Sequence, residues 1–160
     1  MRAATSSPAR SPMPQSYTEL FVHLVWTTRH RHPLLTPDLR SHVYRAMEAE
    51  CARAGAEVVA LGGIEDHVHL LVRMPPTVAP SGLVKQVKGV SSHVANLGRG
   101  HFATFRWQQG YGAFSVSRNH VPRVRDYVLG QEEHHRANRL IPVLEPADAP
   151  TGEPIRHGDG

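Results

Sequence analysis

The stretch EVVALGGIEDHVHLLV, residues 57–72, decides the fold that this sequence predicts. Residues 57–64 and 67–72 are two short, largely apolar segments, and only Glu65 and Asp66 stand between them. Because a two-residue connection permits a tight hairpin, we expect two strands that pair antiparallel. Side chains two apart on such a strand project from the same face.

The segments before this hairpin predict a strand and a helix. Residues 17–26, YTELFVHLVW, are aromatic and β-branched, as in a buried strand. Thr36 and Pro37 form a helix start, and Gly55 is a natural helix stop. Between them an apolar side chain recurs at i+4 spacing, at Leu39, Val43, Met47 and Cys51.

The segments after the hairpin predict two helices separated by an extended segment. An apolar stripe at helical period precedes Gly98 and consists of Leu83, Val87, Val90, Val94 and Leu97. Residues 107–117, WQQGYGAFSVS, are rich in glycine and aromatic residues and predict one or two short strands. Asn119 is the candidate cap of a third helix, with Pro122 in its first turn. The buried stripe of that helix would consist of Val121, Val124 and Val128.

This order of elements predicts an α+β fold in which helices pack on an antiparallel sheet, in a ferredoxin-like arrangement. With 160 residues, the chain is long enough for one domain with a hydrophobic core but too short for two substantial ones. We expect that single domain over residues 16–143. Residues 1–15 and 144–160 are rich in proline and small or charged residues, which predicts disordered tails.

The composition restricts the possible functions. Apolar residues make up 40% and charged residues 20% of the chain, as in a soluble globular protein. Lys and Arg outnumber Asp and Glu by 18 to 14, which mildly favours a polyanionic partner. The single cysteine, Cys51, excludes an internal disulfide and a cysteine-rich metal site. Neither a secretory signal nor an apolar run of roughly 18 residues is present, so we expect a cytoplasmic protein without membrane contact.

Two histidine pairs have a single residue between their members. His67 and His69 project from one face of a predicted strand, where two neutral imidazoles can converge on one metal ion. With 12 histidines, about one such pair arises from composition alone, and His30 with His32 in an Arg-rich loop is a second. We interpret that second pair as solvated. His67 and His69 differ because they lie in an apolar strand, where a histidine must find a partner or lose solvation. Two satisfied polar side chains on an open sheet face are the alternative interpretation.

The third predicted helix carries another polar group. Tyr127, Gln131 and His134 or His135 lie at i, i+4 and i+7 or i+8, and therefore share a face. A tyrosine on an amphipathic helix more often packs its ring at the core boundary, so spacing alone assigns Tyr127 no role. Gly130 lies within the same predicted helix, where glycine costs about 1 kcal/mol relative to alanine.

Together these segments resemble the HUH single-tyrosine transposases of the smallest bacterial insertion sequences, including the REP-associated tyrosine transposases. The resemblance is carried by YTELFVHLVWTTRHRHP (17–33), GGIEDHVHLLVRMPP (62–76), LVKQVKGVSSHV (83–94), WQQGYGAFSVS (107–117) and VRDYVLGQEEHH (124–135). The segments follow in the family's order and span almost all of the predicted domain.

The resemblance implies an HUH endonuclease architecture and a DNA transposase that recognises hairpins in single-stranded DNA. Such an enzyme cuts and rejoins DNA at element ends through a 5′-phosphotyrosine intermediate. In this sequence His67 and His69 match the metal-binding pair, Tyr127 the nucleophile and Gln131 the third metal ligand. The family further implies a homodimer in which the tyrosine helix of one chain serves the histidines of the other. Gly130 departs from the pattern, which has Asn or another polar residue there.

Imidazole and amide ligands, completed by phosphate oxygen and water, suit Mg²⁺ or Mn²⁺. The ion would polarise the scissile phosphate and orient it. We expect basic residues to bind the DNA backbone and exposed aromatic residues, such as Tyr111 or Phe114, to stack on bases. The basic candidates are Lys85, Lys88, Arg73, Arg106, Arg118 and Arg123.

Two other functions fit parts of this pattern. A non-catalytic or domesticated nucleic-acid binding module could use the same ferredoxin-like sheet and basic helices, which would make Tyr127 and the histidine pair incidental. A replication-initiator or relaxase-like nickase would share the histidine pair and the tyrosine chemistry. Such nickases are usually longer, and the segment at 107–117 points away from them.

Overall fold

The computed structural model describes residues 16–100 and 104–142, and the tails predicted at 1–15 and 144–160 lie outside these ranges. Within them, four strands form one sheet in the order β2-β3-β1-β4. The strands are β1 (Leu20–Thr27), β2 (Glu57–Gly63), β3 (His67–Met74) and β4 (Gly112–Val116). All neighbouring strands pair antiparallel, and the central pair β1–β3 runs in register from Leu20↔Met74 to Thr27↔His67.

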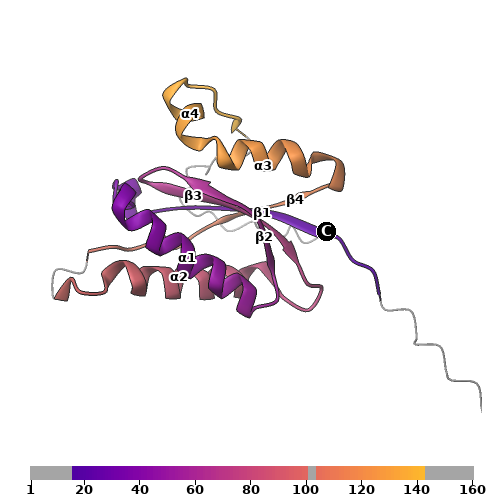
Figure 1. Ribbon diagram of the computed structural model, residues 1–160, viewed down its shortest axis with the longest axis horizontal. Coiled ribbons are helices and arrows are strands. Elements are labelled where there is room, and N and C mark those ends of the chain that lie inside the picture. The colour runs from indigo at the N-terminus through magenta and orange to yellow at the C-terminus, as the bar shows by residue number, and fades with distance from the viewer. Residues whose placement is uncertain (1–15, 101–103, 143–160) are drawn as a thin grey trace, which may run out of the picture.

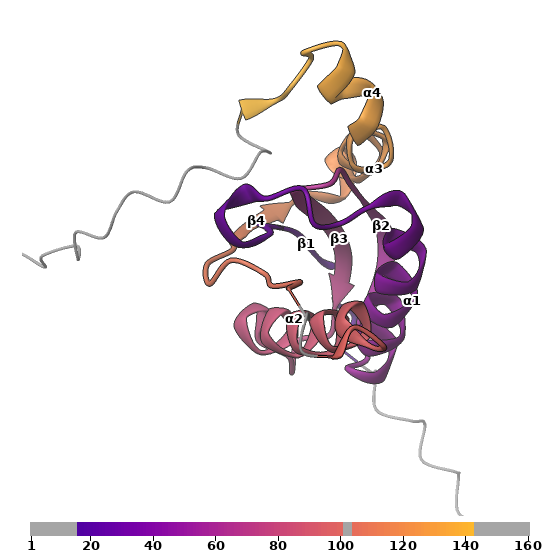
Figure 2. The same ribbon diagram turned by 90° about the vertical axis from the view of Figure 1, so that its left-hand side faces the viewer.

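Helices cover both faces of the sheet (Figure 1). α1 (Pro37–Arg53) and α2 (Pro80–Asn96) lie side by side on one face, and α3 (Val121–Leu129) and α4 (Gln131–Arg136) lie on the other (Figure 2). Two short 3-10 turns, η1 (Arg29–Arg31) and η3 (Arg118–His120), follow β1 and β4. Apart from η1, the elements through β4 run β1-α1-β2-β3-α2-β4. The predicted ferredoxin-like α+β fold is therefore confirmed.

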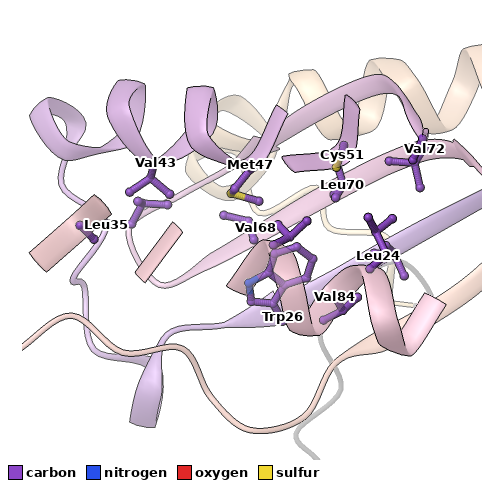
Figure 3. Packing of buried hydrophobic residues seen from close by; sticks show 14 of the residues in the cluster. Leu24, Trp26, Leu35, Val43, Met47, Cys51, Val68, Leu70, Val72 and Val84 are labelled. Carbon is purple, nitrogen blue, oxygen red and sulfur yellow. The ribbon is translucent and has the colours of Figure 1, made fainter. Parts of the chain in front are cut away.

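Successive side chains of the two central strands, β1 and β3, point to opposite faces of the sheet. One face is apolar, and the other is partly polar. The larger core cluster lies between the sheet and α1 and α2, and includes Leu24, Trp26, Met47, Val68 and Leu70 (Figure 3). On the other face Leu71 packs with Val124 and Val128 of α3. Because side-chain direction alternates along a strand, His67 and His69 share the α3 face with Leu71.

The hairpin and the first two helices were predicted correctly. Gly55 follows α1 with φ 76°, the left-handed conformation that commonly ends a helix and that suits glycine. The extended segment 107–117 contains one strand, β4, while Trp107 makes an isolated bridge to Thr28. This bridge attaches the segment before β4 to the end of β1.

The third predicted helix differs from the structure in two respects. Asn119 lies in turn η3 rather than at the cap, which is His120 and makes no side-chain cap hydrogen bond. The helix also ends at Leu129, so Tyr127 and Gln131 lie on two helices separated by Gly130. A Cβ atom at Gly130 would lie 3.1 Å from His134 Nε2 and 3.1 Å from the Asp126 carbonyl oxygen. The His134 ring thus takes up space that a larger residue at position 130 would need.

We predict that Gly62→Ala destabilises the fold, because β2 and α3 approach too closely for a side chain. A Cβ atom there would lie 1.9 Å from the Val128 carbonyl oxygen. Forcing the two elements apart should cost about 1–3 kcal/mol in urea denaturation. Gly89→Ala is the control, since a Cβ at this helical position meets nothing within 4 Å. That change should stabilise the chain by up to about 1 kcal/mol. Equal stability of Gly62→Ala and the unmodified chain would contradict the close-approach argument.

Candidate active site

Three buried histidines gather on the sheet face that α3 covers. His67 and His69 lie on β3 and His23 on β1, each with 0% of its surface exposed. His23 pairs across the strands with Leu71, which makes it a diagonal neighbour of His69. Its Nε2 atom lies 2.9 Å from His69 Nδ1, and the two rings stack with their centroids 5.1 Å apart. The two imidazoles therefore fix each other's orientation.

Tyr127 and Gln131 close over these histidines from the same chain. The Tyr127 ring stands at 90° to the His69 ring, with centroids 5.9 Å apart. Gln131 Oε1 lies 3.3 Å from His67 Nε2, while Gln131 Nε2 donates to the Tyr127 carbonyl oxygen at 3.2 Å. Tyr127 and Gln131 are 2% and 0% exposed. The structure thus brings together all four residues that the sequence singled out for cutting and metal binding.

The sequence pattern assigned no role to three further residues of this cluster. Besides His23, these are Asp66, whose Oδ1 lies 2.6 Å from His67 Nδ1, and His135, whose Nε2 lies 3.2 Å from His67 Nε2. His23 carried the same signal as His67 and His69, a histidine within an apolar strand. Asp66 looked only like a turn residue, because its contact with His67 depends on the turn geometry.

Burial and hydrogen bonding shift the pKa values of His23, His69 and Asp66. It lowers the pKa of His23 to about 4. Burial, followed by the nearby His67, His23 and His135, lowers the pKa of His69 to about 2, against a hydrogen bond with Gln131. For Asp66, burial acts to raise the pKa, but the hydrogen bond with His67 and electrostatic interactions, including that with Arg31, bring the pKa below its usual value. Near pH 7 His23 and His69 are therefore neutral donors, and Asp66 is a carboxylate.

The donor chemistry fits a divalent cation. Because a carboxylate only accepts hydrogen bonds, His67 Nδ1 donates to Asp66, and a neutral His67 presents a lone pair at Nε2. That lone pair faces the Gln131 Oε1 atom, which also has only lone pairs to offer. Among the described residues, no three His, Cys, Asp or Glu side chains are arranged to hold a metal, and the Gln131 oxygen lies 3.3 Å from His67 Nε2 as an additional donor atom. Neutral nitrogen and amide oxygen atoms are suitable ligands for divalent ions.

The hydroxyl group of Tyr127 is held by the chain that follows α4. The Ile141 backbone N–H donates to Tyr127 Oη at 3.1 Å. The His134 ring packs on the Tyr127 ring, with centroids 4.8 Å apart. The phenol oxygen therefore accepts a backbone hydrogen bond that fixes its position within the cluster.

The six basic candidates do not form one surface. Lys85, Lys88 and Arg106 line a single cavity of about 620 Å³, together with Trp107 and Tyr111. Arg73 instead pairs with Glu57 at 3.7 Å, and Arg118 with Glu19 at 3.5 Å. These two residues lie near the end of β1 opposite to the one that meets His67. Arg123 lines a different cavity, beside Phe114 and Ile141.

The remaining sequence candidates are placed as follows. Tyr111 is 40% exposed, which suits stacking, whereas Phe114 is half-buried and packs near His23 with ring centroids 6.1 Å apart. His30 and His32 are exposed, so their interpretation as solvated residues is confirmed. Within the described ranges, no helix is both long and apolar enough to cross a membrane.

Comparison with known proteins gives consistent relatives. Residues 16–131 match the family described as "Transposase IS200 like". The ISDra2 transposase TnpA of Deinococcus radiodurans is 27% identical over 120 residues, which cover 72% of this chain and 86% of that protein. The transposase for insertion sequence element IS200 of Salmonella typhimurium is 23% identical over 135 residues, covering 81% and 88%.

Solved structures show the same fold. A putative transposase from Deinococcus radiodurans superposes with a TM-score of 0.60 at 25% identity, covering 74% of this chain and 95% of that one. A REP-associated tyrosine transposase bound to a REP hairpin superposes with a TM-score of 0.57 at 14% identity, covering 81% and 74%. At that identity the second similarity concerns the fold alone.

We predict that Asp66→Asn weakens the binding of Mn²⁺, because the carboxylate sets the tautomer and orientation of His67. Loss of such a partner should reduce the affinity roughly 10- to 100-fold in a calorimetric titration. Glu65→Gln is the matched control, since it removes the same charge from the adjacent residue, whose carboxylate pairs with Arg40 at 3.6 Å. Equal losses in both variants would indicate a general charge effect and not an oriented histidine.

Proposed function

The chain belongs to the IS200-like transposase family and is a DNA-cutting and rejoining enzyme, and from this we propose that Tyr127 is its nucleophile on single-stranded DNA. The observation that carries the proposal is the packing of Tyr127 against His69, 5.9 Å between ring centroids, in a cluster that also contains His67 and Gln131. A nucleophile, two neutral imidazoles and an amide oxygen in one buried site are the parts that metal-assisted phosphoryl transfer needs.

In the proposed reaction Tyr127 Oη attacks the scissile phosphorus. A bond from the tyrosine oxygen to phosphorus forms and the bond from phosphorus to the 3′ oxygen breaks. The phenol proton passes to solvent, and the leaving 3′ oxygen takes up a proton. The 5′-phosphotyrosine link conserves the phosphodiester, so a later 3′ hydroxyl can reverse the step and join new ends. The hydrogen bond from the Ile141 N–H to Oη holds the phenol oxygen in place beside the histidines before the reaction.

We further propose that His67, His69 and Gln131 hold Mg²⁺ or Mn²⁺. When bound, the ion would polarise the non-bridging oxygens of the scissile phosphate. Asp66 orients His67 for this task, and His23 orients His69 through the 2.9 Å contact between their nitrogens. The neutrality of His69, which follows from its lowered pKa, leaves its lone pair available to a cation.

The cavity lined by Lys85, Lys88 and Arg106 supports single-strand binding, because it combines positive charge with the aromatic rings of Trp107 and Tyr111. Lys88 Nζ donates to the Gln108 and Gly110 carbonyl oxygens at 2.8 and 2.6 Å. Burial lowers the pKa of Lys88 to about 8. Lys88 therefore shapes the cavity, whereas the exposed Lys85 and Arg106 are the residues we assign to phosphate contacts.

The DNA itself is proposed to carry hairpins near the ends of a mobile element, as the family resemblance implies. A relative of this fold has been solved with a REP hairpin, which supports a hairpin ligand. Because the substrate is DNA, we place the enzyme in the cytoplasm. A non-catalytic binding module is not favoured, since binding alone gives no reason to bury Tyr127, Gln131 and the histidines together.

We also propose a homodimer, the commonest closed assembly of soluble proteins. Active sites shared between its chains, as the resemblance implies, would require α3 and α4 to pack on the partner's sheet. The contacts described above, from Tyr127 to His69 and from Gln131 to His67, are made within one chain and support a site completed in cis.

We predict that Tyr127→Phe abolishes cleavage of single-stranded DNA and the covalent protein–DNA adduct, while DNA affinity changes less than about twofold. His67→Ala and His69→Ala should each abolish metal-dependent cleavage, whereas His30→Ala and His32→Ala should retain it because both residues are exposed. Adduct formation is followed by denaturing gel electrophoresis. An adduct with Tyr127→Phe would remove the tyrosine from its proposed role.

We predict that Lys85→Ala and Arg106→Ala weaken single-strand binding and reduce the slope of log affinity against log salt by about 0.7 each, the value for one lost phosphate contact. Arg73→Ala and Arg118→Ala are the comparison variants, because both side chains are already ion-paired, and should change the slope less. Fluorescence anisotropy over a range of salt concentrations measures the slopes. Equal effects of all four variants would assign the DNA to a broader surface.

Mixing two inactive variants tests how the dimer builds its sites. A Tyr127→Phe chain and a chain with both His67→Ala and His69→Ala are combined, and subunit exchange is confirmed first. The contacts within one chain predict no adduct, because neither chain then has a complete cis site. An adduct on the chain that retains Tyr127 would instead establish active sites shared between the chains. Tags of different size identify the chain that carries the DNA.

A further inference from the structure

α4 is held in place mainly by polar side chains. Its sequence, QEEHHR, contains no apolar residue, and of its six residues only Gln131 is buried. A cavity of about 360 Å³ is lined by Arg40 and Tyr44 of α1 and, among others, by Gln131 and Glu132 of α4. The position of α4 relative to α1 therefore depends on hydrogen bonds and ion pairs more than on apolar packing.

Arg40 of α1 reaches across this cavity to α4. Its Nη1 atom forms an ion pair with Glu132 Oε1, and its Nη2 atom lies 3.6 Å from Glu65 Oε1. Glu65 lies in the turn before β3, and Glu132 directly follows Gln131, whose Oε1 atom lies 3.3 Å from His67 Nε2. Arg40 thus connects the turn that precedes His67 with the helix that carries Gln131.

The surroundings of the guanidinium group strengthen this connection. The Arg40 side chain is 15% exposed, whereas the side chains of Glu132 and Glu65 are 60% and 47% exposed. Arg40 Nε is buried and has no hydrogen-bond partner among the described residues. A charge removed from water must be paired, and ionic hydrogen bonds from arginine to carboxylate are stronger than neutral ones. Loss of Glu132 would leave the enclosed charge with the longer ion pair to Glu65.

We propose that Arg40 is a positioning residue, whose ion pair with Glu132 holds α4 in the place where Tyr127 is enclosed. The His134 ring of α4 packs on the Tyr127 ring with centroids 4.8 Å apart, and the Ile141 backbone after α4 donates to its hydroxyl. A displacement of α4 would therefore uncover Tyr127, which is 2% exposed. The role of Arg40 in placing α4 is independent of the chemistry. Its consequence, control of the access of DNA to Tyr127, rests on the proposed function.

The test is the rate at which tetranitromethane nitrates Tyr127 in the full-length chain, measured by peptide mass spectrometry. Tyr111, which is 40% exposed, is the internal reference. Arg40→Gln should raise the ratio of Tyr127 to Tyr111 nitration about three- to tenfold, because loss of a partly enclosed ion pair shifts α4 toward displaced positions by about that factor.

Two variants on α4 separate the ion pair from a general effect of charge. Glu132→Gln should produce the same increase as Arg40→Gln, and the double variant should exceed neither single variant, because both changes remove one interaction. Glu133→Gln is the matched control, since it removes the same charge from the adjacent residue. Its partner, Arg139 at 2.8 Å, lies in the segment after α4 and not on α1. The nitration ratio of Glu133→Gln should stay within about twofold of the unmodified chain.

Salt provides a second readout that requires no substitution. Ions screen charge pairs, so ionic strengths between about 0.05 and 0.5 M should increase Tyr127 nitration in the unmodified chain and change it little in Arg40→Gln. Urea denaturation of the same samples measures the stability of the whole chain. Increased nitration at unchanged stability identifies a displacement of α4, as distinct from general unfolding.

The outcomes distinguish this inference from the proposed function. If Arg40→Gln and Glu133→Gln are nitrated alike, or if nitration rises only in step with lost overall stability, Arg40 has no positioning role and the proposed nucleophile is unaffected. If Arg40→Gln and Glu132→Gln uncover Tyr127 but the unmodified chain forms no covalent adduct with single-stranded DNA, the role of Arg40 stands and the proposed function fails.

Discussion

The alternation of side chains along β3 is the constraint on which the site depends. Val68, Leu70 and Val72 face α1 and α2 and belong to the larger core cluster. His67 and His69 therefore face α3. A shift of one residue in the pairing with β1 would turn the histidines into the apolar core and Val68 and Leu70 toward α3. The energy that favours burial of the apolar residues thus also fixes which way the histidines point.

Burial of the imidazoles connects stability with chemistry. A buried polar ring without partners is costly, so each histidine needs a hydrogen bond. His69 Nδ1 lies 2.9 Å from His23 Nε2, and His67 Nδ1 lies 2.6 Å from Asp66 Oδ1. These same bonds settle which nitrogen of His67 carries the proton and hold both rings in place. The partners required for folding therefore also fix the positions of the nitrogen atoms that are proposed to bind a cation.

The sequence was sufficient for the sheet and the first two helices, because hydrophobic period and helix signals are local. It also singled out four residues that the structure brings together, His67, His69, Tyr127 and Gln131. The sequence did not predict contacts between residues that lie on elements far apart in the chain. His23 had the same apolar context as His69 but no neighbour in sequence that marked it. The break at Gly130 escaped notice because the valine stripe of α3 ends at Val128, before the break. By sequence alone, Arg73 and Arg118 were as good candidates for DNA binding as Lys85. The structure pairs them with acidic residues, Glu57 and Glu19, that are distant from them in the sequence.

The buried position of Tyr127 means that part of the chain would have to move before this residue could act as the proposed nucleophile. With 2% of its surface exposed and its hydroxyl bonded to the Ile141 backbone, Tyr127 cannot reach a phosphate in this arrangement. α3 is anchored by Val124 and Val128, whereas of the six described residues of α4 only Gln131 is buried. Displacing α4 and the segment to Ile141 therefore disrupts less apolar packing than displacing α3. Because Gln131 lies on α4, a displacement of α4 that admits DNA would also carry this proposed metal ligand away from His67. In such a displacement Gly130, which lies between α3 and α4, would be the junction between the two helices.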